Sequence, residues 1–97
     1  MKGLSEGDIV LDTGCLYERY FLCQSRTRLY EKPIYAGVSV TKVPFPSGDQ
    51  WVVGRCIYER ERVEASPEKF PVVGHLDMDE LIIDGVLMEV MKNEDNA

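Results

Sequence analysis

The sequence lacks any uninterrupted apolar run of the roughly 18 residues that a membrane-spanning helix needs. Its first residues, MKGLSEGD, also lack the apolar core of a secretory signal peptide. We therefore expect a cytoplasmic protein that makes no contact with a membrane.

Histidine and cysteine are scarce, with one histidine and three cysteines in the chain. An odd number of cysteines at these spacings matches no disulfide framework, which favours a reducing compartment. Cys15 and Cys23 lie too far apart for the close cysteine pair of a structural zinc site. Nothing in the sequence places His75 beside a cysteine to form a nucleophile and its base. We expect neither a metal nor another cofactor.

Glycine-rich phosphate-binding loops and nucleophile elbows are absent as well. In HLDMDE, Asp77 and Asp79 match the first two ligand positions of an EF-hand loop, but Leu81 stands at the third and Ile82 at the glycine position. The chain is also short for enclosing a deep polar cleft. We therefore expect that it is not an enzyme.

The chain contains 97 residues, of which 44% are hydrophobic and 29% charged, as in an ordinary globular domain. We assign residues 1–92 to a single globular domain and residues 93–97 to a flexible tail. The net charge is −6 and is unevenly distributed, because residues 1–50 carry equal numbers of acidic and basic side chains. An acidic last third repels nucleic acid and attracts a basic protein surface, although the same charge also keeps a small protein soluble.

Turn residues recur at short intervals, which favours short strands over long helices. AGVSVTKV alternates valine with serine and threonine, the pattern of a strand with one buried face. PFPSGD predicts a turn into QWVVGRCIYE, whose two faces are both apolar, as in a central strand that is covered on both sides. ERERVE is charged on both faces and is expected to extend that strand into solvent.

CLYERYFLCQ, which begins at Cys15, is compatible with two structures. Helical spacing gathers its apolar residues more neatly, whereas its aromatic content and the preceding Gly14 favour a strand. We predict a strand, and we predict that its aromatic side chains and thiols, from Cys15 to Cys23, belong to the core.

ELIIDGVLMEV predicts a hairpin that pairs residues 81–83 with residues 86–88, because Asp84 and Gly85 suit a type I′ turn. The alternative is one helix over residues 79–92, in which Gly85 would cost about 1 kcal/mol relative to alanine. The fold we predict is all-β, a small partly open barrel or compact sandwich of about five to seven short antiparallel strands. The alternative is an α+β fold with one short helix.

The charge distribution favours a small non-catalytic protein-binding or regulatory module that uses its acidic last third and an aromatic edge to bind a basic partner. In a sharper form of this hypothesis, acid displayed on strands imitates nucleic acid and inhibits a protein that handles it. The candidate binding residues are Arg26, Arg28, Tyr30, Tyr35, Asp77, Asp79 and Glu80.

Two other interpretations remain. Arg26 and Arg28 with Tyr30 could bind nucleic acid or a small ligand, since basic and aromatic side chains together hold single strands. Glu31 and other acids beside these arginines, and the excess of acid in the whole chain, disfavour a phosphate backbone. A homodimer is the third interpretation, because exposed strand edges pair readily with a copy of themselves.

Overall fold

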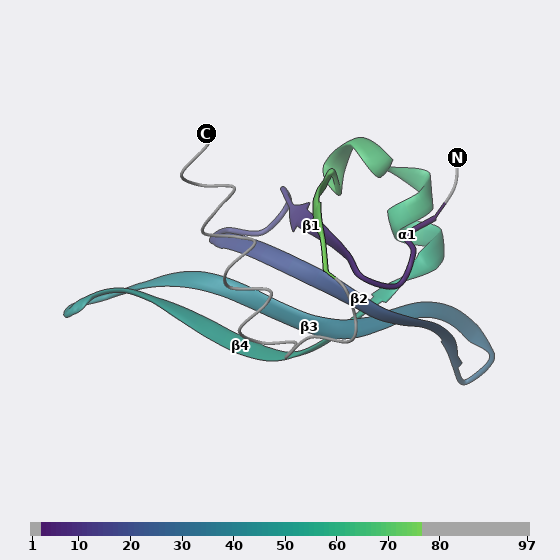
Figure 1. Cartoon of the computed structure of the whole chain (residues 1–97), viewed down its shortest axis with the longest axis horizontal. Coiled ribbons are helices and arrows are strands. Elements are labelled where there is room, and N and C mark those ends of the chain that lie inside the picture. The colour runs from purple at the N-terminus through teal and green to yellow at the C-terminus, as the bar shows by residue number, and fades with distance from the viewer. Residues whose placement is uncertain (1–2, 77–97) are drawn as a thin grey trace.

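The computed structural model describes residues 3–76 as one antiparallel sheet with a short helix beside it (Figure 1). The elements are β1 (Asp8–Asp12), β2 (Glu18–Leu29), β3 (Lys32–Phe45), β4 (Gly48–Glu59), α1 (Arg60–Ala65), the 3-10 turn η1 (Pro67–Lys69) and β5 (Val72–His75). The five strands are ordered β4-β3-β2-β1-β5, so β4 and β5 form the two edges. The predicted antiparallel all-β fold is confirmed.

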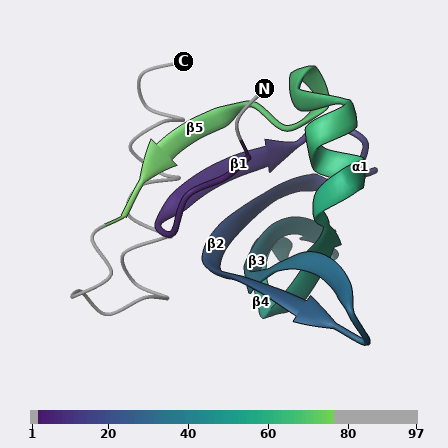
Figure 2. The ribbon, with the colours of Figure 1, turned by 90° about the vertical axis from the view of Figure 1, so that its right-hand side faces the viewer.

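The sheet is open but strongly curved, and one hydrogen bond measures the curvature. The Tyr58 hydroxyl on β4 donates to the Asp12 carboxylate on β1 over 2.7 Å. In a flat sheet these strands would be about 14 Å apart, because neighbouring strands are spaced by about 4.8 Å. The sheet therefore has a concave face, which carries both of these side chains, and a convex face. Figure 2 shows α1 beside this arc of strands.

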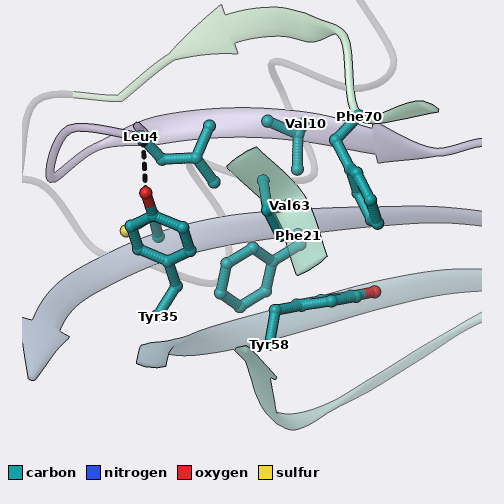
Figure 3. Close-up of a cluster of buried hydrophobic side chains, with 8 residues drawn as sticks. Leu4, Val10, Phe21, Tyr35, Tyr58, Val63 and Phe70 are labelled. Atoms are coloured by element: carbon teal, nitrogen blue, oxygen red, sulfur yellow. Dashed lines mark hydrogen bonds between the residues drawn. The ribbon is translucent and has the colours of Figure 1, made fainter. Parts of the chain in front are cut away.

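The concave face holds the larger apolar cluster (Figure 3). The Phe21 and Tyr58 rings meet edge to face with their centroids 4.8 Å apart, and Phe70 also meets Tyr58 edge to face, at 5.6 Å. Val63 is the buried residue of α1, and it joins the cluster from the helix. The cluster consists of Leu4, Val10, Phe21, Cys23, Tyr35, Tyr58, Val63 and Phe70.

Tyr35 is fully buried and uses its hydroxyl to connect three parts of the chain. The hydroxyl accepts a hydrogen bond from the Leu4 backbone N–H at 3.0 Å (Figure 3). It also donates a hydrogen bond to the Glu64 carboxylate at 2.9 Å. The guanidinium of Arg60 lies 5.9 Å from the centre of its ring. Tyr35 thus fixes both the N-terminal segment and α1 against β3.

The convex face carries a second buried cluster, formed by Ile9, Tyr20, Leu22, Val40 and Leu76. Alternation along the strands explains it, because successive side chains of each strand point to opposite faces. On β3, Val40 belongs to this face, whereas its neighbour Thr41 bonds to Arg19 on the other.

Three expectations from the sequence are wrong. The segment QWVVGRCIYE does form a strand, β4, but it is an edge strand with mostly exposed side chains rather than a covered central one. ERERVE does not prolong that strand, because α1 begins at Arg60. CLYERYFLCQ becomes a strand only from Glu18, and Tyr17, predicted to lie in the core, is 42% exposed.

Several expectations concern residues outside the described part of the chain. They are the hairpin of residues 81–88, the candidate residues Asp77, Asp79 and Glu80, and the tail 93–97. Within residues 3–76, no helix is long and apolar enough to cross a membrane.

The buried thiol of Cys23 and the buried hydroxyl of Tyr58 make the stability of the fold sensitive to alkaline pH. Burial raises the pKa of the Cys23 thiol to about 11 from an ordinary value of 9.0, and the carboxylates of Asp8 and Glu6 add to the shift. Burial and the hydrogen bond to Asp12 also raise the pKa of Tyr58. Both groups therefore release their protons more easily in the unfolded chain, so they stabilise the fold fully below pH 9 and less as the pH rises above it.

We expect the free energy of unfolding to fall between pH 8 and pH 10.5, and to fall less in Cys23→Ala than in the wild type. The substitution removes one of the groups whose protonated form the fold favours. Urea titrations followed by circular dichroism at both pH values measure this difference. Equal losses in the two proteins would contradict the assignment to Cys23.

Candidate binding site at the β2–β3 hairpin

A hollow lies at the end of the β2–β3 hairpin, which projects from the sheet opposite the β3–β4 turn (Figure 1). We call it the hairpin hollow. It has a volume of about 690 Å³ and is lined by Leu29, Tyr30, Glu31, Lys32, Ile34, Ile57 and Glu59. The first five belong to the hairpin, and the last two come from β4, which pairs with β3 there.

Three large apolar side chains of the hairpin hollow are exposed to solvent. The exposed fraction is 96% for Tyr30, 52% for Ile57 and 45% for Leu29. Monomeric proteins rarely leave such side chains together at the surface without a functional reason. Aromatic side chains are also among those that most often anchor interfaces. The hollow is therefore suited to hold an apolar side chain of another molecule.

The turn that carries Tyr30 has an unfavourable backbone conformation for its residues. Leu29 pairs with Lys32, so Tyr30 and Glu31 are the two central residues, and both have positive φ, 49° and 67°. Positive φ at both central positions defines a type I′ turn, which normally contains Asn-Gly. Left-handed backbone costs roughly 1–2 kcal/mol for a residue with a side chain. This turn thus displays a tyrosine at the expense of stability.

Charged side chains also line the hollow. Lys32 and Glu59 form an ion pair of 3.5 Å at its rim, and both side chains are more than half exposed, so the pair adds little stability. Arg28 donates from Nη1 to the backbone carbonyl of Glu31 over 2.9 Å, which braces the turn.

The remaining candidate residues are divided among different places. Arg26 and Arg28 are exposed, and cross-strand pairing of Arg26 with Tyr35 puts them on the concave side, whereas Leu29 and Ile57 lie on the convex side. Tyr35 itself is buried in the core and is not part of this surface. Of the candidate residues that the structure describes, only Tyr30 lines the hairpin hollow.

Leu29 and Ile57 were not recognised as candidates from the sequence. Leu29 stands beside a turn that contains no glycine, asparagine or proline, so nothing marks it as a hairpin end. Ile57 lies in a segment whose two apolar faces indicate a covered strand. An isolated exposed leucine or isoleucine carries no sequence signal until the fold places the two side chains together.

A second hollow of about 490 Å³ adjoins the first and shares Ile57 with it. It lies over the bulge that interrupts β2 between Cys23 and Ser25. Its lining residues are Gln24, Ala36, Gly37, Val38, Arg55, Cys56 and Ile57. The two hollows therefore meet at Ile57, on the convex side of the sheet.

In the described part of the chain, no three side chains among cysteine, histidine, aspartate and glutamate are placed to hold a metal ion. His75 lies 3.1 Å from Asp8 at the surface, in an exposed pair. This pair does not line the hairpin hollow.

Comparisons of the chain with protein-family models, with curated proteins and with solved structures find no match.

Proposed function

We propose that this protein is a small non-catalytic protein-binding module and that the hairpin hollow receives an apolar side chain of its partner. The observation that carries the proposal is the exposure of Tyr30 beside Leu29 and Ile57, in a turn whose backbone conformation is costly for tyrosine. Strained backbone at an exposed aromatic residue supports a role in binding, because nothing in the core requires it. A regulatory or inhibitory role follows if the partner's own activity is blocked on binding.

The charge of the chain suggests the chemistry of the partner. Residues 3–76 carry nine basic and ten acidic side chains, so −5 of the total charge of −6 belongs to the rest of the chain. A partner with an apolar anchor side chain and a basic surface around it would match both the hairpin hollow and the acidic residues outside 3–76. Long-range attraction to the acidic residues would speed association and make it sensitive to salt.

A second candidate, nucleic-acid binding through Arg26, Arg28 and Tyr30, is favoured by one observation. Arg60 reaches the end of the hairpin and donates to the backbone carbonyls of Thr27 at 2.7 Å and Ile34 at 3.2 Å. It adds a third guanidinium group near the two exposed arginines of the concave side. Such a group of arginines is able to contact phosphates.

The test replaces the strained turn by an ideal one, using the double substitution Tyr30→Asn and Glu31→Gly. We expect the variant to unfold at a higher temperature, since Asn-Gly is the preferred type I′ pair, and to lose binding, since the anchor tyrosine is gone. The probe is a phage-displayed library of random peptides selected on the full-length protein. Selected peptides should contain one large apolar residue flanked by lysine or arginine and should bind the variant at least tenfold more weakly.

Leu16→Asn is the matched control, because Leu16 is 89% exposed and lies outside the hollow. It should bind the selected peptides as the wild type does. If the turn variant bound them equally well, or if no peptides were selected, the proposal would be wrong. Retention of mixed fluorescent oligonucleotides at low salt, abolished by Arg26→Ala with Arg28→Ala, would establish the second candidate instead.

A further inference from the structure

The edge strand β4 is long, exposed and without a neighbour on one side among the strands of residues 3–76. It runs for 12 residues, whereas the opposite edge, β5, has only four. Its side chains include Val52 at 46% exposure and Val53 at 36%. Natural proteins protect such edges with charges, prolines or bulges, because a free edge is a template for pairing with another chain. Strand β4 contains no proline and pairs with β3 without a bulge.

The β3–β4 turn determines which backbone groups of β4 face outward. Pro46 and Ser47 form a two-residue connection, so Phe45 and Gly48 are the closing hydrogen-bonded pair. Hydrogen-bonded pairs alternate along an antiparallel ladder. Gly48 and every second residue after it therefore bond to β3, and the N–H and C=O groups of the residues between them point to the open edge. These residues are Asp49, Trp51, Val53, Arg55, Ile57 and Glu59.

We propose that β4 pairs in antiparallel fashion with β4 of a second copy of this chain, about a twofold axis that passes through Val52. This register places Asp49 opposite Arg55 of the second copy and Trp51 opposite its Val53. The N–H and C=O groups of all four residues point to the open edge of β4. The pairing therefore gives these backbone groups hydrogen-bond partners in both copies. The result is one continuous ten-stranded sheet with an isologous interface.

The side chains of this register are complementary. Asp49, Trp51, Val53 and Arg55 share the convex face, because their β3 partners alternate in the same way. The interface thus contains two Asp–Arg pairs and two Trp–Val pairs, all on the same side of the ten-stranded sheet. Neither Asp49 nor Arg55 forms an ion pair within residues 3–76. Both charges are therefore available to a second copy.

Neighbouring registers are less complementary. A twofold axis through Gly54 would place Asp49 opposite Glu59, which is a pair of like charges. An axis through Ile57 would pair Arg55 with Glu59, but only five residues would overlap before α1 begins at Arg60. The register through Val52 alone combines opposite charges with a long overlap. It uses neither Tyr30 nor the turn that the proposed binding function requires, so the two proposals can fail separately.

Charge reversal tests the register by sedimentation equilibrium of the full-length protein at low ionic strength. The wild type should dimerise, and Asp49→Arg or Arg55→Asp alone should weaken its dimer at least tenfold, since each reversal turns both ion pairs of the interface into repulsions. An equimolar mixture of the two single variants should dimerise again, because both cross-pairs are then opposite in charge. The double variant should also dimerise.

Disulfide cross-linking tests the same register independently. With Cys15 and Cys56 replaced by serine, Val52→Cys should form an intermolecular disulfide under mild oxidation, because residue 52 faces its own copy. Gln50→Cys in the same background should not, since it faces Gly54. A monomeric wild type at millimolar concentration would overturn the proposal. So would a mixture of the two charge variants that dimerises no better than either variant alone.

Discussion

Gly37→Ala is expected to destabilise the fold by about 3 kcal/mol or more, the upper range for inserting a group into a well-packed site. A Cβ atom on Gly37 would collide with the backbone carbonyl oxygen of Leu22 and would lie 3.0 Å from the backbone nitrogen of Gln24. Both are main-chain atoms at the bulge of β2, so no side-chain rotation relieves the clash. Strands β2 and β3 would have to separate at the middle of the sheet.

Gly54→Ala provides the matched control on the adjacent strand. A Cβ atom on Gly54 would meet no atom within 4 Å, so we expect a change of less than about 0.5 kcal/mol, with a small gain from the reduced freedom of the unfolded chain. Urea unfolding followed by circular dichroism compares the two variants. If Gly37→Ala unfolded within 0.5 kcal/mol of the control, the close approach of β2 and β3 at the bulge would be disproved.

The alternation of side chains made the central strands predictable. The valines of AGVSVTKV identify β3, and the proline and glycine of PFPSGD identify the turn into β4, because both signals are local. Strand β2 was predicted despite a competing helical pattern. The ambiguity arises because both faces of β2 are buried: Phe21 and Cys23 belong to the concave cluster, and Tyr20 and Leu22 to the convex one, so neither face shows a polar pattern.

The errors have a common physical origin, because each depends on which elements become neighbours. Strand β4 has apolar residues on both faces, but the core covers each face only in part: Tyr58 joins the concave cluster and Trp51 packs against the convex one. Val52 on the concave face and Ile57 on the convex face stay exposed. A sequence pattern records that both faces are apolar and not how much of each is covered. Residues 60–65 form a helix because arginine, glutamate and alanine are good helix formers, while Val63 packs into the concave cluster and Glu64 accepts a hydrogen bond from Tyr35.

The candidate site was only partly predictable for a similar reason. Tyr30 was recognised by its residue type, but the turn that displays it has none of the usual turn residues. Tyr35 has the same residue type and is five positions away, yet its hydroxyl is bonded inside the core. Composition alone does not distinguish an interface tyrosine from a core tyrosine with one polar contact.

Asp12→Ala is expected to destabilise the fold by about 2–3 kcal/mol, within the range for leaving a buried polar group without its partner. The Asp12 carboxylate is buried and accepts hydrogen bonds from the Tyr58 hydroxyl at 2.7 Å and from the Gly14 backbone N–H at 3.0 Å. Its removal leaves the buried hydroxyl with no acceptor and frees the turn after β1. Asp12→Asn should cost less, because an amide oxygen can accept the same bonds.

A double-mutant cycle with Tyr58→Phe isolates the contact that holds β4 to β1. Tyr58→Phe alone leaves the buried carboxylate without its hydroxyl donor, so it should also destabilise the fold, by about 1–2 kcal/mol. Once Asp12 is alanine, the same change removes an unsatisfied hydroxyl and keeps the ring that packs against Phe21 and Phe70. The double variant should therefore be more stable than the sum of the single losses predicts, by about 1 kcal/mol or more. Strict additivity would mean that the hydrogen bond does not hold the curved sheet together, and that the concave cluster alone maintains its curvature.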